Sequence, residues 1–135
     1  MRLELYQAET AHIAKEQSAL LDEARAILLT GKTPSRLEQN GILHAIQILA
    51  ENSIGKAKQL LKAAGQPVPV SAYDCFSALV TQGIISETEL QSWNAAIGLR
   101  SRIVHDYMNI DIDIVFELVR TERYLFIVKF LINPI

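Results

Sequence analysis

The chain has 135 residues, half of them hydrophobic, with a formal net charge of −2 and a pI near 5.9. This length fits a single domain, 1–135, with enough apolar residues for a core. The charge excludes a protein that coats nucleic acid without specificity, because such proteins need a broadly basic surface. A net charge of −2 is still compatible with a small basic pocket on an otherwise acidic surface.

The cysteine content and the apolar segments narrow the class further. A single cysteine, Cys75, excludes an intrachain disulfide and a four-cysteine zinc site, and we expect a buried, unreactive thiol. Residues 1–7 have no apolar run after a basic region, so we expect no signal peptide. The apolar segment 110–135 is interrupted by charged residues, so we expect a core helix, no membrane span and a cytoplasmic protein.

Glycine, proline and capping residues divide the chain into helices. Ser35, Ser71 and Ser86 each precede an acidic residue by three positions, as at capped helix starts, although Thr33 competes with Ser35. Between the breaks, apolar residues recur at three- and four-residue steps, and the alternation typical of strands is absent. The predicted helices lie near 2–29, 34–64, 71–82, 86–107 and 112–132, the last capped by Asp111 or Asp113.

These segments predict an all-α fold, an antiparallel helical bundle of about five helices. The first two helices and the last are long and are expected to pack against one another. We find no repeat, no low-complexity tract and no linker between domains.

The three histidines are candidate metal ligands. Glu9-x-x-His12 is one copy of a spacing that di-iron bundles use twice, with two further glutamates, and neither His44 nor His105 has Glu three residues before it. We therefore expect no metal site, and we expect His12 to lie on a solvated helix face. His44, in an apolar helix, is expected to be partly buried and hydrogen-bonded. Phosphate-binding loops and nucleophile elbows are absent from the sequence.

The segment 100–107 contains the residues best suited to chemistry. A histidine can move a proton to or from a ribose oxygen near neutral pH, and an arginine can bind the phosphate and stabilise developing charge, without a metal. Five residues on an ideal helix turn through about 500°, so Arg100 and His105 point roughly 140° apart. They converge only if the long arginine side chain reaches round the helix or the helix distorts near its end. A twofold dimer would bring a second histidine and arginine to one cleft. The alternative is a polar helix end, where basic residues are favoured anyway.

The wider pattern resembles a known family. Arg100-Ser101-Arg102-Ile103-Val104-His105-Asp106-Tyr107 resembles the Arg-x4-His-x-Tyr signature of HepT-like toxins of the HEPN superfamily. Segments 46–52 and 73–85 resemble the family's second helix and its short third helix with the following turn. The resemblance runs from about residue 1 to 133.

The resemblance implies a homodimeric helical bundle with metal-independent endoribonuclease activity and no cofactor. Arg100 and His105 would be the catalytic pair, with Ser101, Arg102 and Asp106 in supporting or RNA-binding roles. Ser101 stands where the family often has Asn. The partners implied are RNA and a minimal nucleotidyltransferase (MNT) antitoxin of a type VII-like toxin–antitoxin system, which can transfer AMP to the motif tyrosine, here Tyr107. The added bulk and charge would oppose RNA entry.

Two other hypotheses remain at this point. In the first, the chain is a non-enzymatic helical partner of a nucleotidyltransferase, serving as its substrate-binding or regulatory subunit. In the second, it is a helical interaction protein with no catalytic relative.

Overall fold

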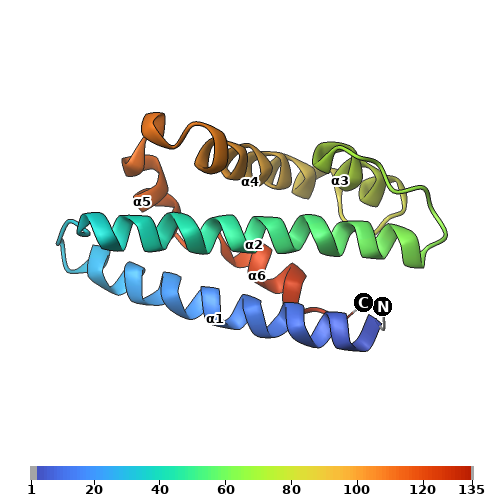
Figure 1. Ribbon diagram of the computed structural model, residues 1–135, viewed down its shortest axis with the longest axis horizontal. Helices are drawn as coiled ribbons and strands as arrows, with labels where there is room; N and C mark the ends of the chain where they lie inside the picture. Colours follow the sequence, from blue (N-terminus) through green and yellow to red (C-terminus); the bar gives the residue numbers. More distant parts are fainter. Residues whose placement is uncertain (1–2, 135) are drawn as a thin grey trace.

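The computed structural model describes residues 3–134, and within this range the regular structure is entirely helical. The elements are α1 (Leu3–Leu29), α2 (Arg36–Ala63), α3 (Ala72–Thr81), α4 (Glu87–His105), the 3-10 turn η1 (Tyr107–Asn109), α5 (Ile112–Arg120) and α6 (Leu125–Ile132). Figure 1 shows α2 running through the middle of the bundle, between α1 on one side and α4 on the other, with α6 behind it. The all-α prediction is confirmed.

The helix starts follow the predicted capping residues. Ser35 and Ser86 each form a complete capping box, in which the serine accepts from the backbone N–H of the residue three positions on and that residue's glutamate accepts from the serine N–H. Ser71 caps α3 through its side chain, and Asp111 caps α5. These caps fix where α2, α3, α4 and α5 begin. The cap of α2 is Ser35 and not the alternative, Thr33.

Helix α4 is shorter than predicted, because it ends at His105 and not at residue 107. The backbone leaves the helical region at Asp106, at φ −142° and ψ 40°, and Tyr107–Asn109 form the separate turn η1. The Asp106 side chain accepts a hydrogen bond from Asn109 Nδ2 at 2.7 Å. Such local polar contacts compete with continued helix. Tyr107 therefore lies outside α4.

The predicted last helix, 112–132, is wrong as a single element, because the chain breaks it into α5 and α6. Glu122 adopts φ 57°, in the left-handed region. The N–H of Arg123 bonds the carbonyl of Leu118 and the N–H of Glu122 bonds that of Val119, which is a Schellman motif with glutamate in the position usually held by glycine. Arg25 of α1 stabilises this turn by pairing with Glu122 at 3.2 Å and donating to the Arg120 carbonyl at 3.0 Å.

One hydrophobic core joins the helices and sets the position of α4. Trp93 of α4 stacks on Phe76 of α3 with ring centroids 4.5 Å apart, and meets Phe126 and Phe130 of α6 edge-on at 4.9 and 4.8 Å. Cys75 is fully buried beside them, as expected. Among the helices of residues 3–134, none combines the length and the apolar run that crossing a membrane requires.

Candidate functional site

The residues singled out by the sequence lie at the end of α4 and in η1. Arg100 is half-buried, whereas His105, the last residue of α4, is exposed. Since both belong to one regular helix, their five-residue separation directs them to different sides of it, roughly 140° apart. A single chain therefore presents the two side chains on separate faces.

Helix α2 holds the predicted catalytic arginine. Glu51 accepts hydrogen bonds from Nε and Nη2 of Arg100 on one carboxylate oxygen, at 3.0 and 2.6 Å. Gln47, one turn earlier on α2, donates to the same oxygen at 3.4 Å. Both members of the ion pair are about one-third exposed, at 31% for Arg100 and 32% for Glu51. The arginine is thus anchored yet accessible to a ligand.

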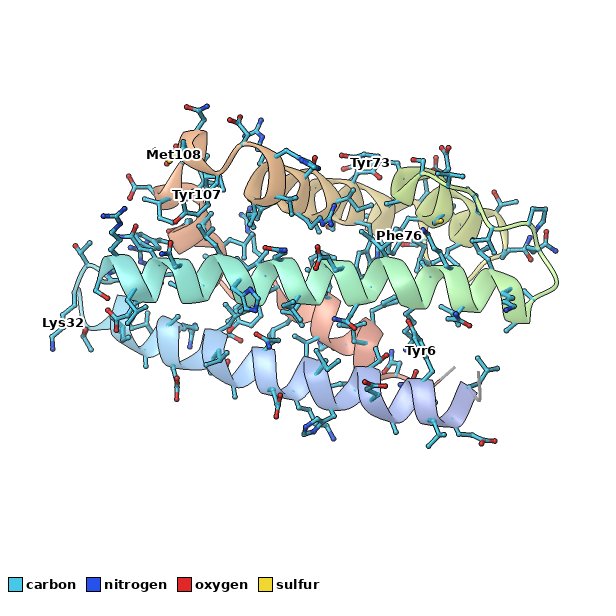
Figure 2. The ribbon with its side chains drawn as sticks, in the orientation of Figure 1. Tyr6, Lys32, Tyr73, Phe76, Tyr107 and Met108 are labelled. Carbon is cyan, nitrogen blue, oxygen red and sulfur yellow. The ribbon has the colours of Figure 1, made fainter. Side chains whose placement is uncertain are left out.

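Helix α2 also holds Tyr107. The Tyr107 hydroxyl donates a hydrogen bond to Oδ1 of Asn40, near the start of α2. In Figure 2 Tyr107 lies between the end of α4 and the first turns of α2, and Met108 points away from the bundle. The Tyr107 side chain is 46% exposed, so its hydroxyl borders on solvent.

The remaining motif residues are spread around the helix end. Ser101 and Arg102 are exposed on α4. The Asp106 carboxylate accepts from Asn109, and among residues 3–134 no ion pair joins it to His105. Asp106 therefore shapes the turn after α4.

The other two histidines lie away from the motif. His12 is exposed on α1, with Nε2 3.1 Å from Glu16. His44 is exposed, so the prediction of a partly buried histidine was wrong: its position on α2 falls on the polar side of the helix, near Asn40 and Gln47. Within the described residues, no three His, Cys, Asp or Glu side chains come together as metal ligands would.

An open groove of about 1030 Å³ separates α4 from α5 and α6. Leu99, Leu118 and Phe126 contribute to its largely apolar walls, and Arg102 lies on its α4 side. Arg100, His105 and Tyr107 do not line it. Arg102 therefore faces the groove, whereas Arg100 and Tyr107 contact polar side chains of α2.

The fold agrees with a comparison against known families. A family model described as Ribonuclease HepT-like matches residues 14–129 of the chain. The chain belongs to this HepT-like family. The matched range includes α2, α4 and η1, and with them the candidate residues described above.

Individual relatives of the HepT-like chain are distant. An mRNA nuclease HepT from Shewanella oneidensis is 27% identical over 82 residues, which is 61% of this chain and 62% of that relative. The chain thus matches less than two-thirds of the relative's length.

Three solved structures share the fold. A toxin–antitoxin complex with AMP-PNP gives a TM-score of 0.79 at 17% identity over 93% of this chain and 97% of the matched one. A tri-AMPylated Shewanella oneidensis HEPN toxin in complex with an MNT antitoxin gives 0.77 at 19%, and a mutant MntA–HpeT toxin–antitoxin structure gives 0.78 at 20%, each over 93% of this chain and 96% of the other.

Sequence reasoning missed Glu51 and Asn40, the α2 residues that contact the motif. They lie 49 and 67 residues away from their partners in sequence. A signal was present: Asn40, Gln47 and Glu51 are spaced seven and four residues apart, which places them on one face of α2. The spacing is a weak signal, because an amphipathic helix normally carries polar residues opposite its core face.

Proposed function

We propose that the chain is the ribonuclease toxin of a toxin–antitoxin pair, with Arg100 and His105 as its catalytic residues. The observation that carries the proposal is the Arg-x4-His-x-Tyr segment, accessible at the end of α4 in a chain that belongs to the HepT-like family. The names of its distant relatives, an mRNA nuclease and toxins solved with MNT antitoxins, support the same conclusion.

The chemistry is metal-independent cleavage of an RNA phosphodiester. A histidine takes the proton of the ribose 2′-hydroxyl, whose oxygen attacks the adjacent phosphorus while the bond to the 5′-oxygen breaks. The 5′-oxygen takes up a proton from water as it leaves. Arg100 binds the phosphate through the N–H groups that Glu51 does not use and stabilises the charge of the transition state.

Because Arg100 and His105 lie on different faces of α4, we expect the active form to be a homodimer. One chain directs its arginine and its histidine to different faces of α4, so a single chain does not bring both side chains to one phosphate. In a twofold dimer, each composite site takes Arg100 from one subunit and His105 from the other. The partner nucleotidyltransferase neutralises the dimer by adding AMP to Tyr107, whose hydroxyl borders on solvent.

The first test measures cleavage of varied RNAs by purified protein in EDTA. His105→Ala and Arg100→Ala should each reduce cleavage at least a hundredfold, as loss of an acid–base or charge-stabilising group does. His12→Ala and Arg120→Ala are matched controls, because both residues are exposed and form only local ion pairs. If the wild type cleaves no RNA yet binds a nucleotidyltransferase tightly, the chain is a non-enzymatic partner.

A mixing experiment tests the composite site. A heterodimer of Arg100→Ala and His105→Ala subunits contains one site with both residues intact. Mixing the two inactive proteins should therefore restore a substantial fraction of activity. If each site used residues of one chain only, mixing would restore none.

A further inference from the structure

Of the three residues of η1, Tyr107 is the one whose side chain forms a hydrogen bond to another helix, and Ile110, which follows the turn, packs partly buried against the core. None of the three residues of η1 is buried, and Met108 is 88% exposed. In the part of the chain that the structure describes, the other hydrogen bonds of the turn are local, between residues 106 and 110. The bond from Tyr107 to Asn40 is therefore the hydrogen bond that joins the turn to α2.

Helix α2 thus positions the motif at two points. Asn40 holds η1, which follows His105 by one residue, and Glu51 holds Arg100. Asn40 and Glu51 are eleven residues apart, about three full helical turns, so they lie on one face of α2 roughly 16 Å apart. One rigid helix thereby sets the spacing between the arginine and the segment that carries the histidine.

We propose that Asn40 is a positioning residue that keeps His105 in place through Tyr107, and that addition of AMP to Tyr107 breaks this contact. The inference rests on the proposed function, in which Tyr107 is the acceptor. Under this proposal, AMP on Tyr107 inhibits the chain in two ways. Its bulk and charge oppose RNA entry, and loss of the Asn40 contact displaces the end of α4.

The chemistry of the modification requires the contact to be lost. The Tyr107 oxygen attacks the α-phosphorus of a nucleoside triphosphate, the bond to pyrophosphate breaks, and the hydroxyl proton passes to water. That proton is the one donated to Asn40. The phosphodiester oxygen has no proton to donate, and the nucleotide does not fit where the hydroxyl met the amide. The turn, held by no buried side chain, moves away from α2.

The contact has opposite effects on the two reactions of the chain. It favours RNA cleavage, because it orders the segment next to His105. It slows AMP transfer, because the acceptor hydroxyl must first leave Asn40. Loss of the Asn40 acceptor therefore lowers cleavage and raises the rate of modification. General destabilisation of the fold would not accelerate the second reaction.

The experiment compares Asn40→Ala with Asn40→Asp, which keeps an acceptor oxygen, and with Leu37→Ala, a control at an 82% exposed position on the same helix. Amide hydrogen exchange of Asp106, Asn109 and Ile110 is followed by NMR. Exchange in Asn40→Ala should be about tenfold faster than in the wild type, and close to the wild-type rate in Asn40→Asp and Leu37→Ala. Wild-type exchange in Asn40→Ala would overturn the proposal.

Two further measurements complete the test. The double variant Asn40→Ala with Tyr107→Phe should exchange no faster than either single variant, because each substitution removes the same hydrogen bond between Asn40 and Tyr107. RNA cleavage by Asn40→Ala should fall about tenfold, and AMP incorporation, followed by intact mass with the nucleotidyltransferase present, should be faster than in the wild type. If the wild type neither cleaves RNA nor accepts AMP, the proposed function fails, and the exchange rates still decide whether Asn40 orders the turn.

Discussion

Glu51 receives two hydrogen bonds from Arg100 on a single carboxylate oxygen, across 49 residues of sequence. The contact uses the Nε–Nη2 edge of the guanidinium, and among residues 3–134 the structure gives the group no other partner. Three of its five N–H donors are therefore directed elsewhere. An arginine held along one edge presents the remaining donors to a phosphate in a fixed orientation.

Glu51→Gln should reduce RNA cleavage about tenfold with little effect on folding. Glutamine preserves the size of the side chain but not its charge, so Arg100 loses the orientation on which phosphate binding depends. The free energy of unfolding should change by less than about 1 kcal/mol, because the pair is partly exposed. Kinetics of RNA cleavage and urea denaturation measure the two effects. Glu117→Gln, which breaks the exposed pair with Arg120, is the control, and equal cleavage by both variants would contradict a positioning role for Glu51.

Lys56→Met should destabilise the fold by about 2–3 kcal/mol. Lys56 is 2% exposed and donates to the carbonyl oxygens of Phe130 and Asn133, both at 2.5 Å, at the end of α6. Methionine fills similar space but leaves two carbonyls without their charged donor. Urea denaturation measures the loss. Lys58→Met, on the same helix, should cost much less, and equal losses would mean that the carbonyl contacts contribute nothing.

The same lysine should make stability rise with pH in the alkaline range. Burial lowers the pKa of Lys56 from 10.5 to about 8. Between these values the unfolded chain binds a proton that the folded chain has released, so the free energy of unfolding increases with pH. Stability measured from pH 7.5 to 9.5 should rise more steeply in the wild type than in Lys56→Met. Parallel curves would show that the ammonium is not desolvated in the fold.

The parts of the fold that were predicted from sequence depend on local signals. Ser35 and Ser86 cap their helices with an acid three residues away, and that pattern is readable in the sequence. The break between α5 and α6 depends on Glu122 in a left-handed conformation, stabilised by Arg25 from α1. No glycine or proline marks it. The turn is specified by a contact 97 residues away, which periodicity does not reveal.

The candidate site also contains some residues that local sequence predicts and others that only the fold brings together. Arg100, His105 and Tyr107 were predicted as site residues because they lie close together in the sequence. Glu51 and Asn40 were not, because their roles arise only when α2 packs beside α4 and η1. The end of α4 was also placed two residues too late, since Asp106 leaves the helical region in a contact with Asn109 that composition alone does not predict.

Glu122→Gly should stabilise the chain by about 0.5–1 kcal/mol. A side chain at φ 57° is strained, and glycine adopts this conformation freely. The variant loses the ion pair with Arg25, but that pair is more than one-third exposed and contributes little. Thermal unfolding measures the change. Glu117→Gly, inside α5, is the control of opposite sign, because glycine in a helix interior is destabilising. A lower melting temperature for Glu122→Gly would show that the Arg25 pair outweighs the strain.

Tyr124→Phe should weaken the fold near neutral pH and protect it at high pH. The Tyr124 side chain is 1% exposed, and its hydroxyl donates to Asp22 at 3.1 Å. Burial, reinforced by the Asp22 carboxylate, raises the pKa of Tyr124 to about 12 from 10.0. Between these values the folded chain keeps a proton that the unfolded chain has lost, so stability falls as pH rises from 10 towards 12.

Phenylalanine removes both the hydrogen bond and the titration. At pH 7 the variant should be less stable by about 1 kcal/mol. From pH 10 upwards the wild type should lose stability faster than the variant, and the two curves should approach each other or cross. Urea denaturation at pH 7, 9, 10 and 11 measures this. A constant difference between the curves across the series would mean that Tyr124 ionises as readily in the folded chain as in the unfolded one, despite its burial against Asp22.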